Sequence, residues 1–151
     1  MIVLVGNSPA TTICAIYLKT ANKKVFVIRD DSELGYKTTV LPGYKGTQSE
    51  YNNECFRQAI NIVGEENYLE CKSTEIVVGE KNIIVNNRKI DFNLLVVDSH
   101  ETYQINDKNI ISVVNFMKDH EGLTDEVYNE AIILASMGCK IAYMIKEMKI
   151  E

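Results

Sequence analysis

The sequence predicts an α/β domain built in three layers, with a parallel central sheet and a small antiparallel meander. Apolar runs at residues 1–5 and 25–28 predict two buried strands. The segment between them has helical periodicity, and such strand–helix–strand units join parallel strands by a right-handed connection almost without exception. Short alternating segments at 74–78 and 83–85, separated by residues 79–82, predict the meander.

The first helix is predicted from Pro9 to residue 22. The Ser8 hydroxyl can cap this helix, and Pro9 suits its first position because the missing N–H would be unpaired there. An apolar stripe at helical spacing then runs along one face, formed by Ala10, Ile13, Cys14, Tyr17, Leu18 and Ala21.

A second helix is predicted to begin near Thr47, after a loop that starts at residue 30. Thr47 and Glu50 have the spacing of a capping box, and the helix is expected to end at Gly64. Further strands are predicted at residues 68–71, 92–97 and 110–114.

The last predicted helix has the clearest amphipathic pattern. Thr124 can cap it, and Leu123 and Tyr128 are placed for a hydrophobic staple. Acidic residues at its start and lysines at its end complement the helix dipole. One face collects the apolar residues Val127, Ala131, Leu134, Ala135, Gly138, Ala142 and Ile145.

Length and composition indicate one domain over residues 1–151. The hydrophobic share of 46% and charged share of 25% are those of an ordinary soluble protein. No apolar run approaches the roughly 18 residues that span a bilayer, and no signal peptide precedes the first strand. We therefore expect a cytoplasmic location and no membrane partner. The net charge of −5, with scattered Lys and Arg, argues against sequence-specific nucleic-acid binding.

No residue pattern predicts a metal site or a catalytic triad. The cysteines lack the C-x-x-C spacing of zinc clusters and thioredoxin-type dithiols, so we expect core residues at Cys14, Cys55, Cys71 and Cys139. His100 and His120 have no partner at metal-ligand spacing. Asp98, Ser99 and His100 are neighbours along an extended segment, and neighbours there point to opposite faces.

The turn after the first strand stands where dinucleotide-binding proteins carry G-x-G-x-x-G. Gly6 supplies the first glycine, which allows the tight turn. Ser8 and Thr11 replace the other two, and Ser8 adds a Cβ where a pyrophosphate would come close. The helix N-terminus still offers N–H groups to an anion. A nucleotide-binding turn and a strand–helix–strand unit that binds nothing therefore both stay open.

The second strand ends at Arg29, where a dinucleotide site usually places an acidic residue for the ribose hydroxyls. Arg29 reverses that charge. It would favour a phosphorylated ribose, give up the adenosine, or simply face solvent. Asp30 comes one residue later and by strand alternation points the other way.

Residues 1–30 resemble the opening of low-molecular-weight thioredoxin reductases, which belong to the pyridine nucleotide-disulfide oxidoreductase family. In these flavoproteins an NADPH domain interrupts the FAD domain. The resemblance is carried by Pro9-Ala10, residues 15–18 and Ala21-Asn22, and it continues in the family's order at residues 38–40, 42–43, 92–97, 128–131 and 136–139.

The resemblance implies a Rossmann-like FAD/NAD(P)-binding domain that holds FAD or an adenine nucleotide. The turn and the resemblance together imply the cofactor-binding residues Gly6, Asn7, Ser8, Pro9, Ala10, Arg29 and Asn115.

Departures from the family are equally informative. Val97-Asp98-Ser99-His100 replaces the family's A-T-G stretch, and Val114-Asn115 stands where the family has G-D near the flavin. Only residues 103–110 lie where the NADPH domain would be inserted, and that domain carries the redox-active C-x-x-C. The resemblance therefore implies a protein without hydride source or dithiol.

Three functional hypotheses follow. In the first, favoured here, the chain is a non-catalytic, reduced reductase relative that acts as a compact interaction module. It would bind a protein or ribonucleoprotein assembly such as the ribosome, or form a homodimer, with a nucleotide or FAD retained structurally. The abundance of Ile, Asn and Lys, which have A/T-rich codons, fits such trimming in a compact genome.

The second hypothesis is a minimal flavin- or nucleotide-binding redox protein reduced by an external donor. The third is a reductase that uses two of the four cysteines as its redox pair, which their spacing supports poorly.

Overall fold

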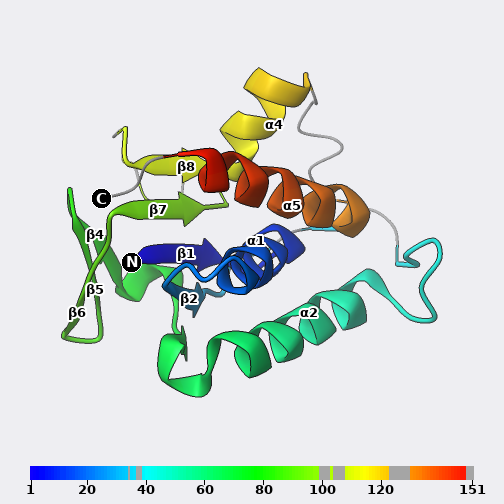
Figure 1. The fold of residues 1–151 in the computed structure, drawn as a ribbon. Coiled ribbons are helices and arrows are strands. Elements are labelled where there is room, and N and C mark those ends of the chain that lie inside the picture. Colours follow the sequence, from blue (N-terminus) through cyan, green and yellow to red (C-terminus); the bar gives the residue numbers. More distant parts are fainter. Residues whose placement is uncertain (34, 37–38, 99–102, 104–107, 123–129, 149–151) are drawn as a thin grey trace.

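A five-stranded parallel sheet, in the order β3-β2-β1-β7-β8, forms the middle layer of the molecule (Figure 1). This computed structural model describes residues 1–33, 35–36, 39–98, 103, 108–122 and 130–148. Each neighbouring pair of strands in the sheet is parallel. The strands are β1 (Ile2–Gly6), β2 (Val25–Arg29), β3 (Tyr68–Glu70), β7 (Leu94–Val97) and β8 (Ile110–Ser112).

Helices cover one face of this sheet, and a small antiparallel sheet covers the other. Helix α1 packs against both α2 and α5, and α4 follows β8 (Figure 1). The helices are α1 (Pro9–Thr20), α2 (Gln48–Val63), α4 (Val113–Glu121) and α5 (Ala131–Glu147), with short 3-10 turns η1 (Glu65–Asn67) and η2 (Ser73–Glu75). The small sheet consists of β4 (Ile76–Val78), β5 (Asn82–Val85) and β6 (Arg88–Asp91). The predicted three-layer α/β architecture is confirmed.

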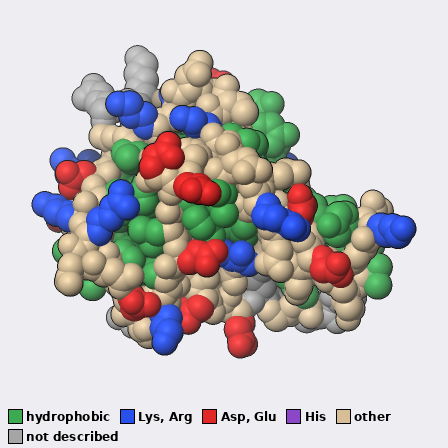
Figure 2. Space-filling view, turned by 90° about the horizontal axis from the view of Figure 1, so that it is seen from below, with side chains coloured by type: hydrophobic (Ala, Val, Ile, Leu, Met, Phe, Trp, Pro, Cys, Tyr) green, Lys and Arg blue, Asp and Glu red, His purple; other side chains and the backbone are tan. Residues whose placement is uncertain are grey.

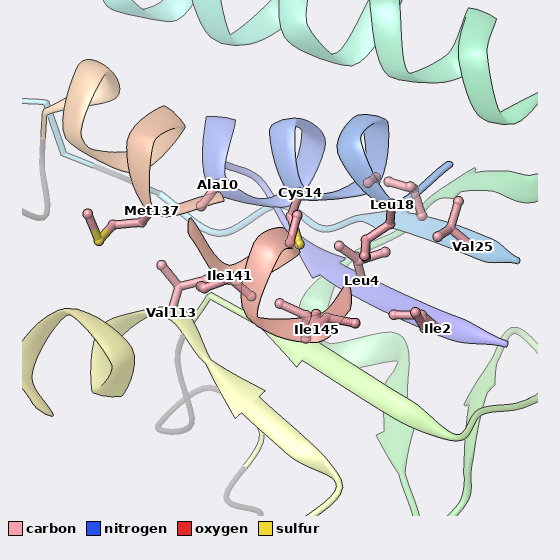
Figure 3. Packing of buried hydrophobic residues seen from close by; sticks show 14 of the residues in the cluster. Ile2, Leu4, Ala10, Cys14, Leu18, Val25, Val113, Met137, Ile141 and Ile145 are labelled. Atoms are coloured by element: carbon pink, nitrogen blue, oxygen red, sulfur yellow. The ribbon is translucent and has the colours of Figure 1, made fainter. Parts of the chain in front are cut away.

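Alternation along the central strands builds two cores. Ile2 and Leu4 of β1 belong to the core on the helix side, whereas Val3 and Val5 belong to the core beneath the small sheet. Figure 3 shows the helix-side core, where Leu4 lies together with side chains from α1 and α5. Because both faces of these strands are buried, their sequences are continuous apolar runs, as parallel strands require.

The backbones of α1 and α5 approach each other closely at Gly138. A Cβ atom at Gly138 would lie 2.6 Å from the carbonyl oxygen of Ala10 and 3.0 Å from the backbone nitrogen of Cys14. Gly138 is buried against the backbone of α1. A glycine is therefore required for the two helices to pack at this distance.

Two of the predicted helix starts are confirmed in detail. The Ser8 Oγ accepts a hydrogen bond from the Ala10 N–H at 3.1 Å, with Pro9 at the first helical position. At α2, Thr47 Oγ1 accepts from the Glu50 N–H at 3.0 Å, while the Glu50 carboxylate accepts from the Thr47 N–H at 3.1 Å. The capping box that the spacing predicted is thus complete.

Replacing Thr47 by alanine is expected to lower the free energy of unfolding by about 1 kcal/mol, because the Glu50 N–H loses its acceptor. Urea titration measures the change. Thr47→Ser keeps the hydroxyl and is the matched control, which should unfold close to the wild-type midpoint. Equal midpoints for the alanine and serine variants would show that this cap contributes nothing.

The predicted strand at 110–114 is corrected at its end. It stops at Ser112, and Val113 begins α4, a helix that the sequence did not predict. Ser112 caps α4 by accepting from the Asn115 N–H at 3.2 Å. Apolar residues stand on both sides of Ser112, so periodicity alone could not locate the boundary between strand and helix.

The meander also has a third strand, β6, that the sequence did not predict. Only Ile90 in this strand is buried, which is too weak a pattern to recognise. The turn before it uses Asn86 and Asn87 at φ 51° and 65°. Two successive left-handed residues are typical of a tight hairpin, and asparagine tolerates that conformation.

The last helix begins later than predicted. Glu130 has an extended backbone and the helix starts at Ala131, whose N–H donates to the side-chain oxygen of Gln48 in α2 at 2.7 Å. The cap therefore comes from a residue far away in sequence. Thr124, the predicted staple and Val127 lie outside the described residues, as do residues 104–107 of the segment 103–110.

Candidate functional site

The turn from β1 to α1 encloses a carboxyl group of the protein itself. Asp98, directly after β7, accepts hydrogen bonds from the Asn7 N–H, the Ser8 hydroxyl and the Thr11 hydroxyl, each at 3.0 Å. The residue is 6% exposed. β1 and β7 are neighbouring parallel strands, so their carboxyl ends bring this side chain to the turn.

Gly6 is required by this internal contact. A Cβ atom at Gly6 would overlap the Asp98 carboxylate and lie 2.5 Å from Thr11 Oγ1. Gly6, the glycine of the dinucleotide pattern, is therefore needed here because it leaves space for the Asp98 carboxyl group. Ser8 and Thr11, which replace the later glycines, both donate hydrogen bonds to the same carboxyl group.

Three N–H groups at the start of α1, where a phosphate would bind, are paired within the protein. The Ala10 N–H donates to Ser8 Oγ, the Thr11 N–H donates to the Ser8 carbonyl at 3.1 Å, and Pro9 has no N–H. The Asn7 N–H donates to Asp98. A helix N-terminus attracts anions through such free donors, and here the protein's own groups have taken them.

A second buried acid lies beside the first. Asp30 accepts from the Ser32 N–H at 3.1 Å and the Ser32 hydroxyl at 2.6 Å, and the Tyr103 hydroxyl donates to its other oxygen. Burial, together with the charge of Asp30, raises the pKa of Asp98 to about 7 despite its hydrogen bonds. Burial and the contact with Asp30 also raise the pKa of Tyr103.

Arg29 is built into the fold. Its Nε donates to Asn7 Oδ1 at 2.8 Å and its Nη2 donates to Asn53 Oδ1 at 2.7 Å. The guanidinium lies 4.1 Å from the centre of the Phe56 ring. Arg29 thus connects the β1–α1 turn to α2. It does not simply face solvent, which was one of the three expectations for this residue.

The structure brings six of the seven predicted site residues together. Gly6, Asn7, Ser8, Pro9 and Ala10 form the turn, and Arg29 reaches it through Asn7. Asn115 lies apart, in the first turn of α4, where it lines a hollow with Ser112, Phe116, His120 and Met144.

A polar hollow of about 440 Å³ opens beside the turn, between the loop after β2 and helix α2. Its walls include Asn7, Arg29, Ser32, Tyr36, Asn52 and Asn53. Sequence reasoning found the first two and missed the rest. A neighbouring hollow of about 340 Å³, lined by Asp30, Cys71 and Lys72 among others, lies on the other side of Arg29.

Three of the four cysteines lack the lowered pKa of a redox thiol. All four are free. Burial raises the pKa of Cys14 and Cys55, and burial with nearby acids raises that of Cys71 to about 11. Cys71 and Cys139 are partly exposed rather than core residues as expected. Reactive cysteines need a lowered pKa, which these three thiols lack.

Within the described part of the chain, no three His, Cys, Asp or Glu side chains gather as a metal site would require. His120 instead stacks on Phe116, with ring centres 4.9 Å apart. Ser99 and His100 lie outside the described residues.

The residues at the turn do not fit the pyrophosphate of a dinucleotide. An incoming phosphate would meet the Asp98 carboxyl group and N–H donors that are already paired. Two buried acids, Asp98 and Asp30, would repel it. Arg29 is the cation that contacts the turn, and two of its N–H groups are already bound to the side chains of Asn7 and Asn53 rather than free for a phosphate.

Basic side chains do not gather on the face seen in Figure 2. On the face seen in Figure 2, Lys and Arg side chains are interspersed with Asp and Glu around a hydrophobic area.

Among the described helices, none combines the length and the apolar character needed to cross a membrane.

No protein-family model and no curated protein sequence matches the chain. Solved structures do match. TrxB of Bacillus anthracis, described as a thioredoxin reductase, superposes with a TM-score of 0.50 at 12% identity, over 64% of this chain and 35% of that chain. A ferredoxin-flavin thioredoxin reductase from Clostridium acetobutylicum gives 0.48 at 18% identity, over 64% and 36%. The flavin-dependent brominase Bmp2 gives 0.48 at 13% identity, over 64% and 37%.

The chain thus spans about a third of the length of these proteins. The superposition on TrxB confirms the predicted fold, and at 12% identity it bears on the fold alone. With its strand order and its helix after β1, the chain has a Rossmann-like α/β fold, which it shares with about a third of a thioredoxin reductase.

Proposed function

We propose that this chain is a non-catalytic, reduced relative of a reductase flavin domain, which acts as a compact interaction module in a larger assembly. One observation carries the proposal: the Asp98 carboxyl group fills the place at the start of α1 where a cofactor phosphate would bind. In either protonation state this group occupies the space and the donors. Function depends on the site rather than the fold, and this site serves the protein's own structure.

The thiols support the same proposal. A reductase needs a reactive dithiol, and three of the four cysteines have a raised pKa while none has C-x-x-C spacing. We therefore place no electron transfer on this chain. The partner in the proposal is a protein or ribonucleoprotein assembly such as the ribosome, with a homodimer as the simpler form.

An exposed aromatic pair supports a role in protein contacts. Tyr17 of α1 and Tyr143 of α5 lie 6.0 Å apart between ring centres, and Lys146 lies over the Tyr143 ring at 4.2 Å. Tyr143 is 56% exposed and Ile132 on the same helix is 54% exposed. Tyrosines with both apolar and polar surface are enriched at protein interfaces.

FAD, ADP and NADPH are expected to leave the melting temperature unchanged, because a bound ligand must raise it and the Asn7 and Ala10 N–H groups of the turn are already paired within the protein. Protein purified from its own source should also lack the flavin absorbance near about 450 nm. A yellow protein, or a clear shift with any of the three, would instead support the minimal flavin- or nucleotide-binding redox protein.

A double variant can test whether the filled turn is what prevents nucleotide binding. Ser8→Gly combined with Asp98→Ala removes the internal carboxyl group and restores a glycine, so this double variant should gain a thermal shift with ADP. Asp91→Ala removes an exposed acid in β6 and is the matched control, which should gain none.

The assembly is tested by sedimentation of a native lysate. The chain should travel with a large complex, and Tyr143→Ser should return part of it to the free fractions. Finding it only as a free monomer would contradict the interaction role.

A further inference from the structure

We propose that the exposed seam between α1 and α5, formed by Tyr17, Tyr143 and Lys146, binds an acidic segment of a partner protein. The segment would place a carboxylate on Lys146 and an apolar side chain against the two tyrosines. This inference rests on the proposed interaction role, and it adds the chemistry of the partner. It is carried by the contacts within the seam, by an ammonium group without an ion pair, and by the charges nearby.

The seam lies where two packed helices present their outer surfaces. α1 and α5 lie side by side and end on the same side of the molecule (Figure 1). After their close approach at Gly138, the side chains of Tyr17 and Tyr143 meet with ring centres 6.0 Å apart and ring planes at 46°. Both rings are exposed. Tyrosine loses little conformational entropy on binding, so a pair that already packs together is a preorganised contact surface.

Lys146 is held over both rings. Its Nζ lies 4.2 Å from the centre of the Tyr143 ring and 5.7 Å from the centre of the Tyr17 ring, as in a cation–π contact. The ion pairs among the described residues are Arg57–Glu54 and Lys140–Glu121, and Lys146 takes part in neither. An exposed ion pair gains little when two long side chains must first be ordered. Here the lysine is already positioned, so a carboxylate would meet a prepared cation.

The tyrosines add polar and apolar surface without adding negative charge. A hydrogen bond with the Cys139 side chain is the main cause that raises the pKa of Tyr17, so its hydroxyl group stays neutral near pH 7. Ile132 continues the apolar surface along α5, since it is exposed and stands about three turns before Tyr143 on the same side of the helix. The seam therefore suits a segment that carries both apolar and acidic side chains.

Further lysines stand at the same end of α1. Lys19 lies in its last turn, and Lys23 and Lys24 follow directly. None of the three forms an ion pair with a described residue. The chain as a whole is acidic, with 21 Asp and Glu against 16 Lys and Arg. A local group of lysines without carboxylate partners in an acidic protein is complementary to an acidic surface on another molecule.

A protein carboxylate fits the seam better than a nucleic acid. Lys146 already covers one face of the Tyr143 ring, and single-stranded nucleic acids bind tyrosine by stacking a base on such a face. An extended RNA would also meet the acids that give the chain its net charge of −5. A short acidic segment is affected only by charges within the screening length of about 10 Å.

The test uses a fluorescently labelled peptide of glutamate and leucine, with the same peptide carrying glutamine in place of glutamate as its counterpart. The anisotropy of the acidic peptide should rise when the full chain is added, and added salt should reduce the rise because it screens the charges. The glutamine peptide should bind several times more weakly. Labelled polyuridine RNA, as a third probe, should also bind more weakly than the acidic peptide.

Lys146→Gln removes the charge of the seam and should weaken binding of the acidic peptide about fivefold. Lys146→Arg keeps the charge and its place over the rings, so it should bind close to the wild type. Lys140→Gln is the matched control. It removes the same charge from the same helix, but Lys140 is already paired with Glu121 at 2.9 Å, so the affinity should stay that of the wild type.

The proposal is overturned if the acidic peptide does not bind, if the glutamine peptide binds equally well, or if Lys146→Gln and Lys140→Gln have equal affinities. Tighter binding of polyuridine would identify RNA as the occupant, and self-association that Tyr143→Ser abolishes would identify a second copy of the chain. Either result also overturns it. A chain that sediments with a large complex yet ignores the acidic peptide would keep the interaction role and lose this inference alone.

Discussion

Replacing Gly138 by alanine is expected to lower the free energy of unfolding by about 2–3 kcal/mol, since the new methyl group would press on the backbone of α1. The atoms it would meet are the Ala10 carbonyl oxygen at 2.6 Å and the Cys14 nitrogen at 3.0 Å. Neither is the end of a flexible side chain, so the helices must move apart. The same change would stabilise α5 by about 1 kcal/mol through the higher helix propensity of alanine. We expect the clash with α1 to outweigh this gain, so that the protein is destabilised.

Ser136→Ala provides the matched control, because Ser136 lies on the exposed side of the same helix. There the alanine contacts no neighbouring helix, and its higher helix propensity should leave the protein unchanged or slightly more stable. Thermal unfolding of both variants measures the difference. A Gly138→Ala protein as stable as the Ser136→Ala protein would show that α1 and α5 do not pack as closely as described.

Local patterns were enough to predict most of the fold. The strand–helix–strand opening, the capping box at Thr47 and the end of α2 at Gly64 each depend on residues close together in sequence, and all three are confirmed. The elements that were missed depend on distant partners. β6 exists because β5 pairs with it, and α5 begins at Ala131 because Gln48 of α2 accepts its N–H. No local pattern contains that information.

The sequence located the turn after the first strand, but it did not predict which group fills that turn. Ser8, Thr11 and Arg29 were recognised as departures from a dinucleotide site, yet the group that fills the turn was not identified. A signal was present: Asp98 follows the strand that pairs with β1, so both end at one edge of the sheet. Hydroxyls at Ser8 and Thr11, in place of glycines, are the donors that a buried carboxyl group needs. Tyr36 and Asn52 carried no such signal, because their relation arises only from packing.

The stability of the protein is expected to fall as the pH rises from about 4 to 7, because Asp98 must ionise in a buried place. Its pKa is raised from 3.8 to about 7, with burial as the main cause and the charge of Asp30 as the second. The folded chain therefore binds a proton more tightly than the unfolded chain. Stability from this group is complete below the lower value and is lost as the pH passes the higher one, by at most about 1.4 kcal/mol per pH unit.

Asp98→Asn should remove this dependence and keep the turn intact. The asparagine oxygen can accept from the Asn7 N–H, and its amide N–H groups can donate to the Ser8 and Thr11 hydroxyl oxygens, so every neighbour of Asp98 keeps a partner. At pH 8 the variant should be more stable than the wild type by up to about 4 kcal/mol, and the two should converge near pH 4. Urea unfolding at several pH values measures both.

Other titrating groups face the same cluster, and the comparison of variants separates them from Asp98. Asp30, Tyr36 and Tyr103 all interact with it electrostatically. Asp91→Asn removes an equal charge from the exposed strand β6 and should follow the wild-type pH profile. If Asp98→Asn loses stability with pH as steeply as the wild type, the buried proton belongs to another group. A flat profile for Asp98→Asn means that Asp98 is the group whose ionisation destabilises the wild type.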